Sequence, residues 1–303
     1  MISYDGLFYL LEKNGLKKSE LTEKVGISSR TIAKMSKGEK IADNVIARLC
    51  DFFGCKRENI VSEKNDNKIL QALREEKNAK ISGGLYHETQ VRLTYNSNRI
   101  EGSRLSEDQT RLIFETNTVG AEDGLLVDDI IETANHFRAI DYIIDCAEAP
   151  LTEEIIKRLH KILKTGTKDS YLSWFNVGEY KQRANTVGGS CTTPPSEVGA
   201  EIKKLLADYN KKDVTIEDII EFHYNFEKIH PFQDGNGRVG RLICFKECLR
   251  FNIVPFIIED RKKIFYYRGL KEWDSEKGYL IDTCLDGQDI YKALLDYLGI
   301  NYK

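Results

Sequence analysis

The stretch His230-Pro-Phe-Gln-Asp-Gly-Asn-Gly-Arg-Val-Gly-Arg241 lies between two helical patterns and decides how they are joined. Over residues 216–229, apolar side chains recur at helical spacing and predict a buried helix face. Because Pro231 disfavours helical geometry in the residue before it, this helix should end at His230. The apolar residues after the stretch indicate a second, mostly buried helix that begins near residues 236–237.

The glycines of this stretch favour the binding of an anion. Gly235 and Gly237 can adopt backbone angles that other residues resist, so that successive N–H groups converge on one negative group. The positive end of the following helix dipole strengthens this attraction. Arg238 and Arg241 are three residues apart and share a helix face, where they can bind further phosphates. Asp234 offers the hard oxygen ligand that suits Mg²⁺ shared with phosphate oxygens.

His230 stands just before this anion site, in the position of a general base for an incoming hydroxyl. Together these residues predict a triphosphate site with a base beside it. A plain turn between two helices is the alternative, because His-Pro, Asp-Gly and Asn-Gly pairs also occur in such turns. The joint occurrence of a base, an acid, a glycine pair and two arginines in one short stretch favours the site.

The stretch resembles the signature of the Fic family, His-Pro-Phe-x-Asp/Glu-Gly-Asn-Gly-Arg-x-x-Arg, and matches it at every defined position. The resemblance implies an all-α fold, in which a helical Fic core carries a small β-hairpin flap. It also implies transfer of AMP from ATP to a Ser, Thr or Tyr hydroxyl of a protein target, which could be the chain itself. Gly237 stands where the family's phosphate-kinase branch has a lysine, which disfavours γ-phosphoryl transfer.

The same resemblance assigns roles to single residues. His230 would be the catalytic base that deprotonates the target hydroxyl, and Asp234 would hold Mg²⁺. Phe232 would anchor the loop in the core, and Tyr267 would lie near the nucleotide base. The remaining nucleotide-binding residues would hold the α-phosphate with backbone amides and the β- and γ-phosphates with guanidinium groups: Gly235, Asn236, Gly237, Arg238 and Arg241.

A second stretch, Ser97-Asn-Arg-Ile-Glu-Gly102, is similar to the family's inhibitory motif, Ser/Thr-x-x-x-Glu-Gly/Asn. The resemblance implies an inhibitory helix at about 90–102. Its motif residues are Ser97, Glu101 and Gly102. Glu101 would form a carboxylate–guanidinium fork with Arg241 in the place of the γ-phosphate, which predicts low basal activity.

Two other functions stay open at this point. Glu101 could orient a water against a phosphodiester while His230 protonates the leaving hydroxyl, which would make the chain a de-AMPylase with the same site. Alternatively, the chain could be a DNA-binding regulator whose Fic-like domain senses nucleotide without catalysis. The choice among ATP, UTP and other nucleotides also stays open.

Residues 175–195 interrupt the helical pattern with glycine and proline pairs. The segment resembles the family's flap, a hairpin whose edge holds the target's backbone beside the base by strand addition. The family's usual Tyr-Arg pair is Tyr180-Lys181 in this chain, with Arg183 nearby. The docking residues that the resemblance implies are Thr186, Val187 and Gly188.

Residues 1–63 contain short helical segments separated by turns at glycine, and they resemble the Cro/repressor type of helix-turn-helix domain. Residues 1–60 carry 11 Lys/Arg against 8 Asp/Glu, a net charge of +3, whereas the whole chain carries −3. This charge is compatible with DNA binding and also with a protein-interaction module. The recognition helix would offer five residues to a DNA groove: Ser28, Ser29, Arg30, Thr31 and Lys34.

The composition is that of a soluble globular chain of 303 residues, with 41% hydrophobic and 31% charged residues. No apolar run approaches the length of a membrane span, and seven cysteines without metal-type spacing indicate a reducing compartment. We therefore expect a cytoplasmic protein without a membrane partner, and a homodimer is compatible with the sequence. The expected domains are a helix-turn-helix domain (1–63), a linker with a mainly exposed helix (64–84) and a Fic domain (85–303).

Overall fold

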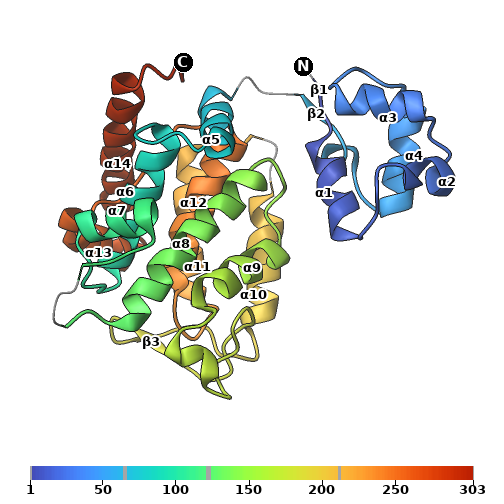
Figure 1. Cartoon of the computed structure of the whole chain (residues 1–303). Helices are drawn as coiled ribbons and strands as arrows, with labels where there is room; N and C mark the ends of the chain where they lie inside the picture. Colours follow the sequence, from blue (N-terminus) through green and yellow to red (C-terminus); the bar gives the residue numbers. More distant parts are fainter. Residues whose placement is uncertain (1, 64–66, 121–123, 211–212, 303) are drawn as a thin grey trace. The chain divides into compact units, whose positions relative to one another are not determined.

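The computed structural model describes residues 2–63, 67–120, 124–210 and 213–302 (Figure 1). The chain forms two compact units, one made mainly of the chain up to Asn67 and the other of most of the chain from Lys68 onward. Residues 64–66 of the expected linker lie outside the described residues. In the described ranges no helix is long and apolar enough to cross a lipid bilayer.

The first unit is a small bundle of helices, as the helix-turn-helix resemblance implied. Its helical elements are α1 (Asp5–Lys13), α2 (Glu20–Val25), α3 (Ser29–Ser36), α4 (Asp43–Phe53) and the short 3-10 helix η1 (Arg57–Asn59). Gly26 ends α2 and Gly54 ends α4, both in the left-handed conformation with φ of 69° and 61°. The core is built from one apolar face of each element and includes Leu7, Leu21, Met35, Ile46 and Leu49.

Two strands in the first unit were not expected from the sequence. Strand β1 (Ile2–Ser3) pairs antiparallel with β2 (Ser62–Glu63), so that the two ends of the unit are joined by backbone hydrogen bonds. Each strand has two residues, which is too short for an alternating apolar pattern to be visible.

The second unit is almost entirely helical. Its elements are α5 (Lys68–Ala79), α6 (Leu85–Ile100), α7 (Glu107–Thr116), α8 (Val127–Asp145), α9 (Glu153–Lys164), η2 (Lys168–Tyr171), β3 (Thr186–Val187), β4 (Ser190–Cys191), α10 (Val198–Tyr209), α11 (Ile216–Ile229), α12 (Asn236–Arg250), η3 (Asp260–Lys262), α13 (Lys263–Glu272) and α14 (Gly278–Tyr297). The expected fold class, all-α with one small hairpin in this unit, is confirmed.

Helix α12 forms the centre of the second unit. Every residue of α12 except the last, Arg250, is buried. It packs against α6, α8, α9 and α11, and Figure 1 shows it among these helices. A helix covered on all sides needs apolar or paired side chains around its whole circumference. Its N-terminus, which carries the end of the signature, is therefore held in place by several elements.

Helix α5 is less exposed than expected. Three of its apolar side chains are buried, namely Ile69, Leu70 and Leu73. The helix packs against α6 and α8, and its basic residues Arg74 and Lys77 donate hydrogen bonds to backbone carbonyls near the end of α8. Nine of the twelve residues of α5 are exposed or half-buried, so the expected mainly exposed helix differs from the structure only in the packing of its apolar side against α6 and α8.

The close packing of α13 against α14 gives a stability prediction. A Cβ at Gly269 would lie 2.7 Å from the backbone N and Cα of Leu280, so Gly269→Ala should lower the free energy of unfolding by about 1–3 kcal/mol. Gly199→Ala in α10 is the matched control, since nothing lies within 4 Å of its added Cβ. It should be neutral or stabilise by up to ~1 kcal/mol. Urea unfolding followed by circular dichroism measures both, and equal midpoints would contradict the packing.

Candidate active site

The signature connects α11 to α12, as the sequence predicted. Helix α11 ends at His230, which is its C-cap residue in the left-handed conformation with φ of 51°. The His230 N–H donates to the Phe226 carbonyl at 2.9 Å, and Pro231 follows where the helix cannot continue. Helix α12 begins at Asn236, within the predicted range. The imidazole is thus fixed at the rim of α11.

His230 has the protonation state that a general base requires. Its side chain is 17% exposed, and Nδ1 lies 3.9 Å from Oε2 of the half-buried Glu227 without a hydrogen-bond partner among the described residues. Burial, together with the ammonium charge of Lys181, lowers the pKa of His230 to about 4. The imidazole is therefore neutral at neutral pH and able to accept a proton.

The loop of the signature is stabilised by hydrogen bonds between its own residues and by the packing of Phe232. The side-chain amide of Asn236 accepts from the Phe232 N–H at 2.8 Å and donates to the Phe232 carbonyl at 2.9 Å. Phe232 is fully buried and stacks on the ring of His160 at 4.0 Å, which confirms its packing as a core anchor. Asn236 was expected to bind phosphate. Its side chain is instead engaged within the loop, so that only its backbone N–H is left for a ligand.

The N-terminus of α12 is already covered by a carboxylate. Gly235, with φ of 80°, is the N-cap residue of the helix, and as a glycine it has no side chain that could cap it. A Cβ at Gly237 would collide with Oε1 of Glu101 and lie 2.9 Å from Nη1 of Arg241. A larger residue at this position would therefore force the Glu101 carboxylate to move. A carboxylate of the same chain thus lies at the place where the sequence predicts an anion site.

Glu101 binds Arg241, but not as the expected fork. Glu101 is the residue at which α6 ends, and its Oε1 lies 2.7 Å from Nη2 of the buried Arg241. The same guanidinium also donates to Ser97. Its Nε lies 3.0 Å from the Ser97 Oγ, and its Nη2 lies 2.9 Å from the Ser97 carbonyl oxygen. Gly102 follows with φ of 98°. The helix also begins at Leu85, earlier than the predicted position near residue 90.

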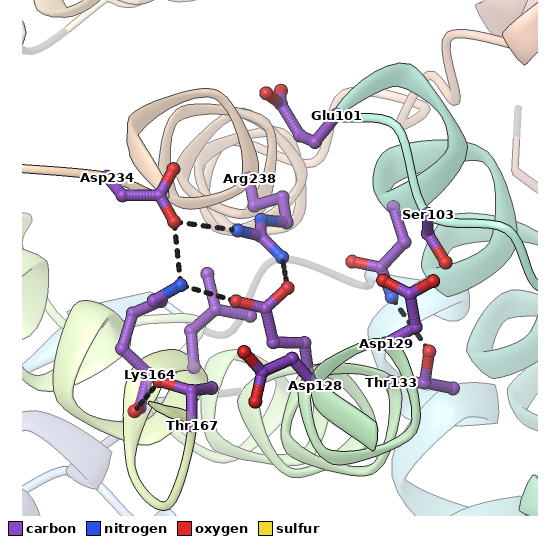
Figure 2. Close-up of polar contacts among 12 residues, drawn as sticks. Glu101, Ser103, Asp128, Asp129, Thr133, Lys164, Thr167, Asp234 and Arg238 are labelled. Carbon is purple, nitrogen blue, oxygen red and sulfur yellow. Dashed lines mark hydrogen bonds and ion pairs between the residues drawn. The ribbon is translucent and has the colours of Figure 1, made fainter. Parts of the chain in front are cut away.

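Asp234 belongs to a closed set of alternating charges, which we call the charge ring and which consists of Asp234, Lys164, Glu132 and Arg238. Oδ2 of Asp234 lies 2.6 Å from Nζ of Lys164 and 3.5 Å from Nη2 of Arg238 (Figure 2). Glu132 closes the ring, since its Oε1 lies 2.5 Å from Nζ of Lys164 and its Oε2 binds Nη1 of Arg238. Although burial opposes it, the charges of Arg238 and Lys164 hold the pKa of Asp234 well below its ordinary value.

Two members of the charge ring were missed in the sequence. Lys164 follows Ile156 and His160 at intervals of four residues, on the apolar face of α9, and a lysine on such a face is a signal of a buried charge. Glu132 lies on α8 and carries no comparable signal. Neither residue lies in the signature, and only the fold brings them to it.

Asp234 can hold a metal ion only with help from a ligand. The described residues contain no group of three or more His, Cys, Asp or Glu that could bind a metal. The carboxylate of Asp234 is 50% exposed and ionised, and both cations approach the same oxygen, Oδ2. One exposed carboxylate combined with phosphate oxygens is the usual arrangement for Mg²⁺ at nucleotide sites. The residues therefore fit a magnesium ion shared with a nucleotide.

The expected flap is a hairpin that rests on the signature loop. Strands β3 and β4 pair with each other in antiparallel orientation, and Thr186 lies opposite Cys191. The turn residues Gly188 and Gly189 have φ of 55° and 83°, as in a two-residue hairpin turn. Val187 is 45% exposed, so the predicted docking edge is accessible.

Lys181 fixes the base of this hairpin. Its N–H donates to the Pro231 carbonyl at 2.9 Å, and its ammonium donates to Asn185 at 2.8 Å and to Thr192 at 2.6 Å. Asn185 in turn donates to the Phe232 carbonyl at 3.1 Å. Burial lowers the pKa of Lys181 to about 8. The lysine in the place of the family's arginine thus connects both sides of the flap to the signature.

Tyr267 lies beside the end of α6. Its hydroxyl donates to the Ile100 carbonyl at 3.1 Å, and the side chain is 43% exposed. The neighbouring Tyr266 is buried, and its hydroxyl lies 2.8 Å from Nε2 of His223 and 3.4 Å from Nη1 of Arg241. Tyr267 is accessible to a nucleotide base, although contact with one stays a prediction.

In the first unit, the five residues predicted to face DNA divide into two groups. Ser28 caps α3, because its Oγ accepts from the Thr31 N–H at 3.2 Å and also contacts the Thr31 hydroxyl. These two side chains are engaged in the helix cap. Ser29 and Arg30 are exposed and Lys34 is half-buried, so these three are available to a ligand.

Comparisons with known proteins agree with both resemblances. The model of the Fic/DOC family matches residues 150–247, and that of the Cro/C1-type HTH DNA-binding domain matches residues 7–62. The relatives include the Protein adenylyltransferase Fic of Drosophila erecta, 26% identical over 249 residues, and that of Drosophila melanogaster, 29% identical over 182 residues. These alignments cover 80% and 58% of this chain, and 47% and 36% of the relatives, so the chain spans less than half of their length.

Solved structures show the same fold. A Fic domain containing signaling protein from Bacteroides thetaiotaomicron is 24% identical with a TM-score of 0.60, and the match covers 78% of this chain and 98% of that protein. Fic-1 from C. elegans is 16% identical with a TM-score of 0.59, over 96% of this chain and 97% of that one. The chain therefore contains a Fic domain of the Fic/DOC family, preceded by a Cro/C1-type helix-turn-helix domain.

Proposed function

We propose that this chain is a protein adenylyltransferase that moves AMP from ATP to a hydroxyl of a protein target. One observation carries the proposal: the carboxylate of Glu101 lies over the N-terminus of α12, against Gly237 and Arg241, where a phosphate group would bind. A neutral imidazole stands beside this anion site. The relatives in insects bear the name of this activity.

The residues support a direct transfer. His230 takes the proton of the target hydroxyl, and the freed oxygen forms a bond to the α-phosphorus while the bond to the β-phosphate oxygen breaks and pyrophosphate leaves. Amides at the start of α12 hold the α-phosphate, and Arg238 and Arg241 bind the outer phosphates. Asp234 and the phosphates would hold a magnesium ion, whose positive charge would offset the negative charge of the leaving group.

The target would be positioned by the flap. The exposed edge of β3 offers backbone groups for strand addition, and the base of the hairpin is fixed to the signature through Lys181 and Asn185. A segment added to this edge would lie beside the loop that carries His230. We infer that a backbone in extended conformation presents the hydroxyl.

We also infer that Glu101 restrains the reaction. An ATP that binds with all its phosphates in place must displace this carboxylate from Arg241, because both anions need the same guanidinium. If only a few per cent of the molecules can transfer AMP while Glu101 is bound to Arg241, removal of the Glu101 carboxylate should raise AMP transfer about tenfold or more.

The test is AMP transfer from labelled ATP with magnesium, read by mass spectrometry of the protein and of cell lysate. Glu101→Gly should raise transfer, Glu101→Gln should raise it because the charge is lost, and His230→Ala in the Glu101→Gly chain should abolish it. Equal transfer by wild type and Glu101→Gly would make the inhibitory role wrong. Loss of AMP from a modified protein only when Glu101 is present would favour the de-AMPylase.

The protonation of His230 predicts the pH dependence. The base works in its neutral form, which is present above its pKa and is lost as the pH falls through it. In the Glu101→Gly chain the acid limb of kcat/KM should therefore lie at pH 4 or below, under the 6.5 of an ordinary histidine, because the negative charge of Glu101, which raises the pKa of His230, is lost. Lys181→Met should move this limb upward, because it removes a positive charge beside the imidazole. An acid limb near pH 6.5 both with and without Lys181→Met would contradict the assignment of His230 as the base.

For the first unit we propose DNA binding through the start of α3. Arg30 is exposed there, and the family model that matches the unit is described as DNA-binding. Arg30→Ala should weaken binding to genomic fragments by roughly 5- to 100-fold in an electrophoretic shift assay, as expected for one base contact. Lys56→Ala, outside α3, is the control and should have little effect. The absence of any shift for the wild type would favour a protein-interaction role instead.

A further inference from the structure

Lys164 is a buried cation whose ammonium binds Asp234, the residue expected to hold the metal ion of the proposed phosphate site. Its side chain is 2% exposed, at the last residue of α9. Lysine is almost never buried to this degree unless its charge is paired. The role of Lys164 therefore depends on the groups that pair with its charge.

The ammonium of Lys164 is surrounded by carboxylates. Asp234 lies at 2.6 Å, Glu132 at 2.5 Å and Asp169 at 3.7 Å from Nζ. Figure 2 shows Lys164 and Arg238 approaching the same oxygen of Asp234. Oxygen ligands of this charge and number are what proteins usually offer to a divalent cation. Here an amino group of the chain takes that place.

This arrangement has a consequence for metal binding. The negative charge of Asp234 is already compensated from the buried side of the site by Lys164. A divalent ion on the exposed side of this carboxylate would lie within a few ångströms of the ammonium, and like charges at such a distance in a partly buried site repel strongly. The phosphates of a nucleotide would offset this repulsion, because they bring further negative charge.

We propose that Lys164 is an internal counter-cation of the phosphate site, which weakens the affinity of Asp234 for free divalent ions so that the metal ion enters together with the nucleotide. The effect on free metal ions follows from the charge ring alone. Only the order of entry rests on the proposed function. Lys164 acts through Asp234, so it is a positioning and charge-setting residue.

The competing explanation is that Lys164 only orients Asp234. The two explanations predict opposite changes in the affinity for the metal ion when the charge of Lys164 is removed. If Lys164 repels the metal ion, removal of its charge tightens metal binding, whereas if it merely orients Asp234, removal loosens the carboxylate and weakens metal binding.

The experiment measures Mn²⁺ binding to the full chain without nucleotide, from the electron paramagnetic resonance signal of the free ion. Lys164→Gln removes the charge and keeps an amide that can donate to Asp234, and Lys164→Met is a second uncharged variant should the first fail to fold. We expect the Kd for Mn²⁺ to fall roughly tenfold or more in the uncharged variants. Circular dichroism establishes that each variant is folded.

Two control variants isolate the charge. Lys164→Arg keeps the positive charge and should leave the Kd near that of the wild type. Lys161→Met removes an exposed ammonium one turn earlier on the same helix and should also change nothing. A folded Lys164→Gln or Lys164→Met chain whose Kd is unchanged or higher would overturn the proposal.

A second titration in the presence of a non-hydrolysable ATP analogue tests the order of entry. The wild type should bind Mn²⁺ much more tightly with the analogue than without it, and this gain should be smaller in Lys164→Gln. Equal gains would overturn the order of entry. Failure of Glu101→Gly to transfer AMP would overturn the proposed function and leave the Mn²⁺ titrations without nucleotide valid, so the two failures are distinguishable.

Discussion

The buried N-terminus of α12 needs an anion, and much of the second unit is arranged around that need. The first N–H groups of a helix have no partner within the helix, and here water cannot reach them freely, because the helix is covered along its whole length. The usual solution is a cap by the side chain of the N-cap residue, and Gly235 has no side chain to supply it. The carboxylate of Glu101, brought by the end of α6, lies at this place instead.

The same site concentrates cations that must each be paired. Arg238 and Arg241 are almost completely buried, and an unpaired charge in such a place is strongly destabilising. Arg238 and Lys164 share Glu132 and Asp234, whereas Arg241 takes Glu101 and Ser97. In this structure a carboxylate of the chain balances the charge of Arg241, at the place where the proposed function puts a phosphate of the ligand.

The parts of this site that could be predicted from the sequence are those set by local rules. A proline disfavours helical geometry in the residue before it, so the position of His230 at the end of α11 was predictable from Pro231. The start of α12 and the glycine turn of the hairpin were predictable as well. Glu132 and Lys164 could not be assigned to the site, because they reach it only through the packing of α8 and α9 on α12. The side chain of Asn236 binds the N–H and the carbonyl of Phe232, four residues earlier, a local contact that the sequence pattern did not indicate. The predicted contact of Asn236 with phosphate is thereby limited to its backbone N–H.

The contacts of Arg241 also indicate how the site can change state. Two of its donors bind Ser97, which is buried on α6, while the bond to Glu101 comes from a partly exposed side chain at the helix end. Tyr267 holds the Ile100 carbonyl independently of Glu101. These contacts of Ser97 and Ile100 do not involve the Glu101 carboxylate, so the end of α6 could keep them if that side chain rotated away from Arg241. On the proposed function, a nucleotide would then have to offset one ion pair and would not have to unfold a helix.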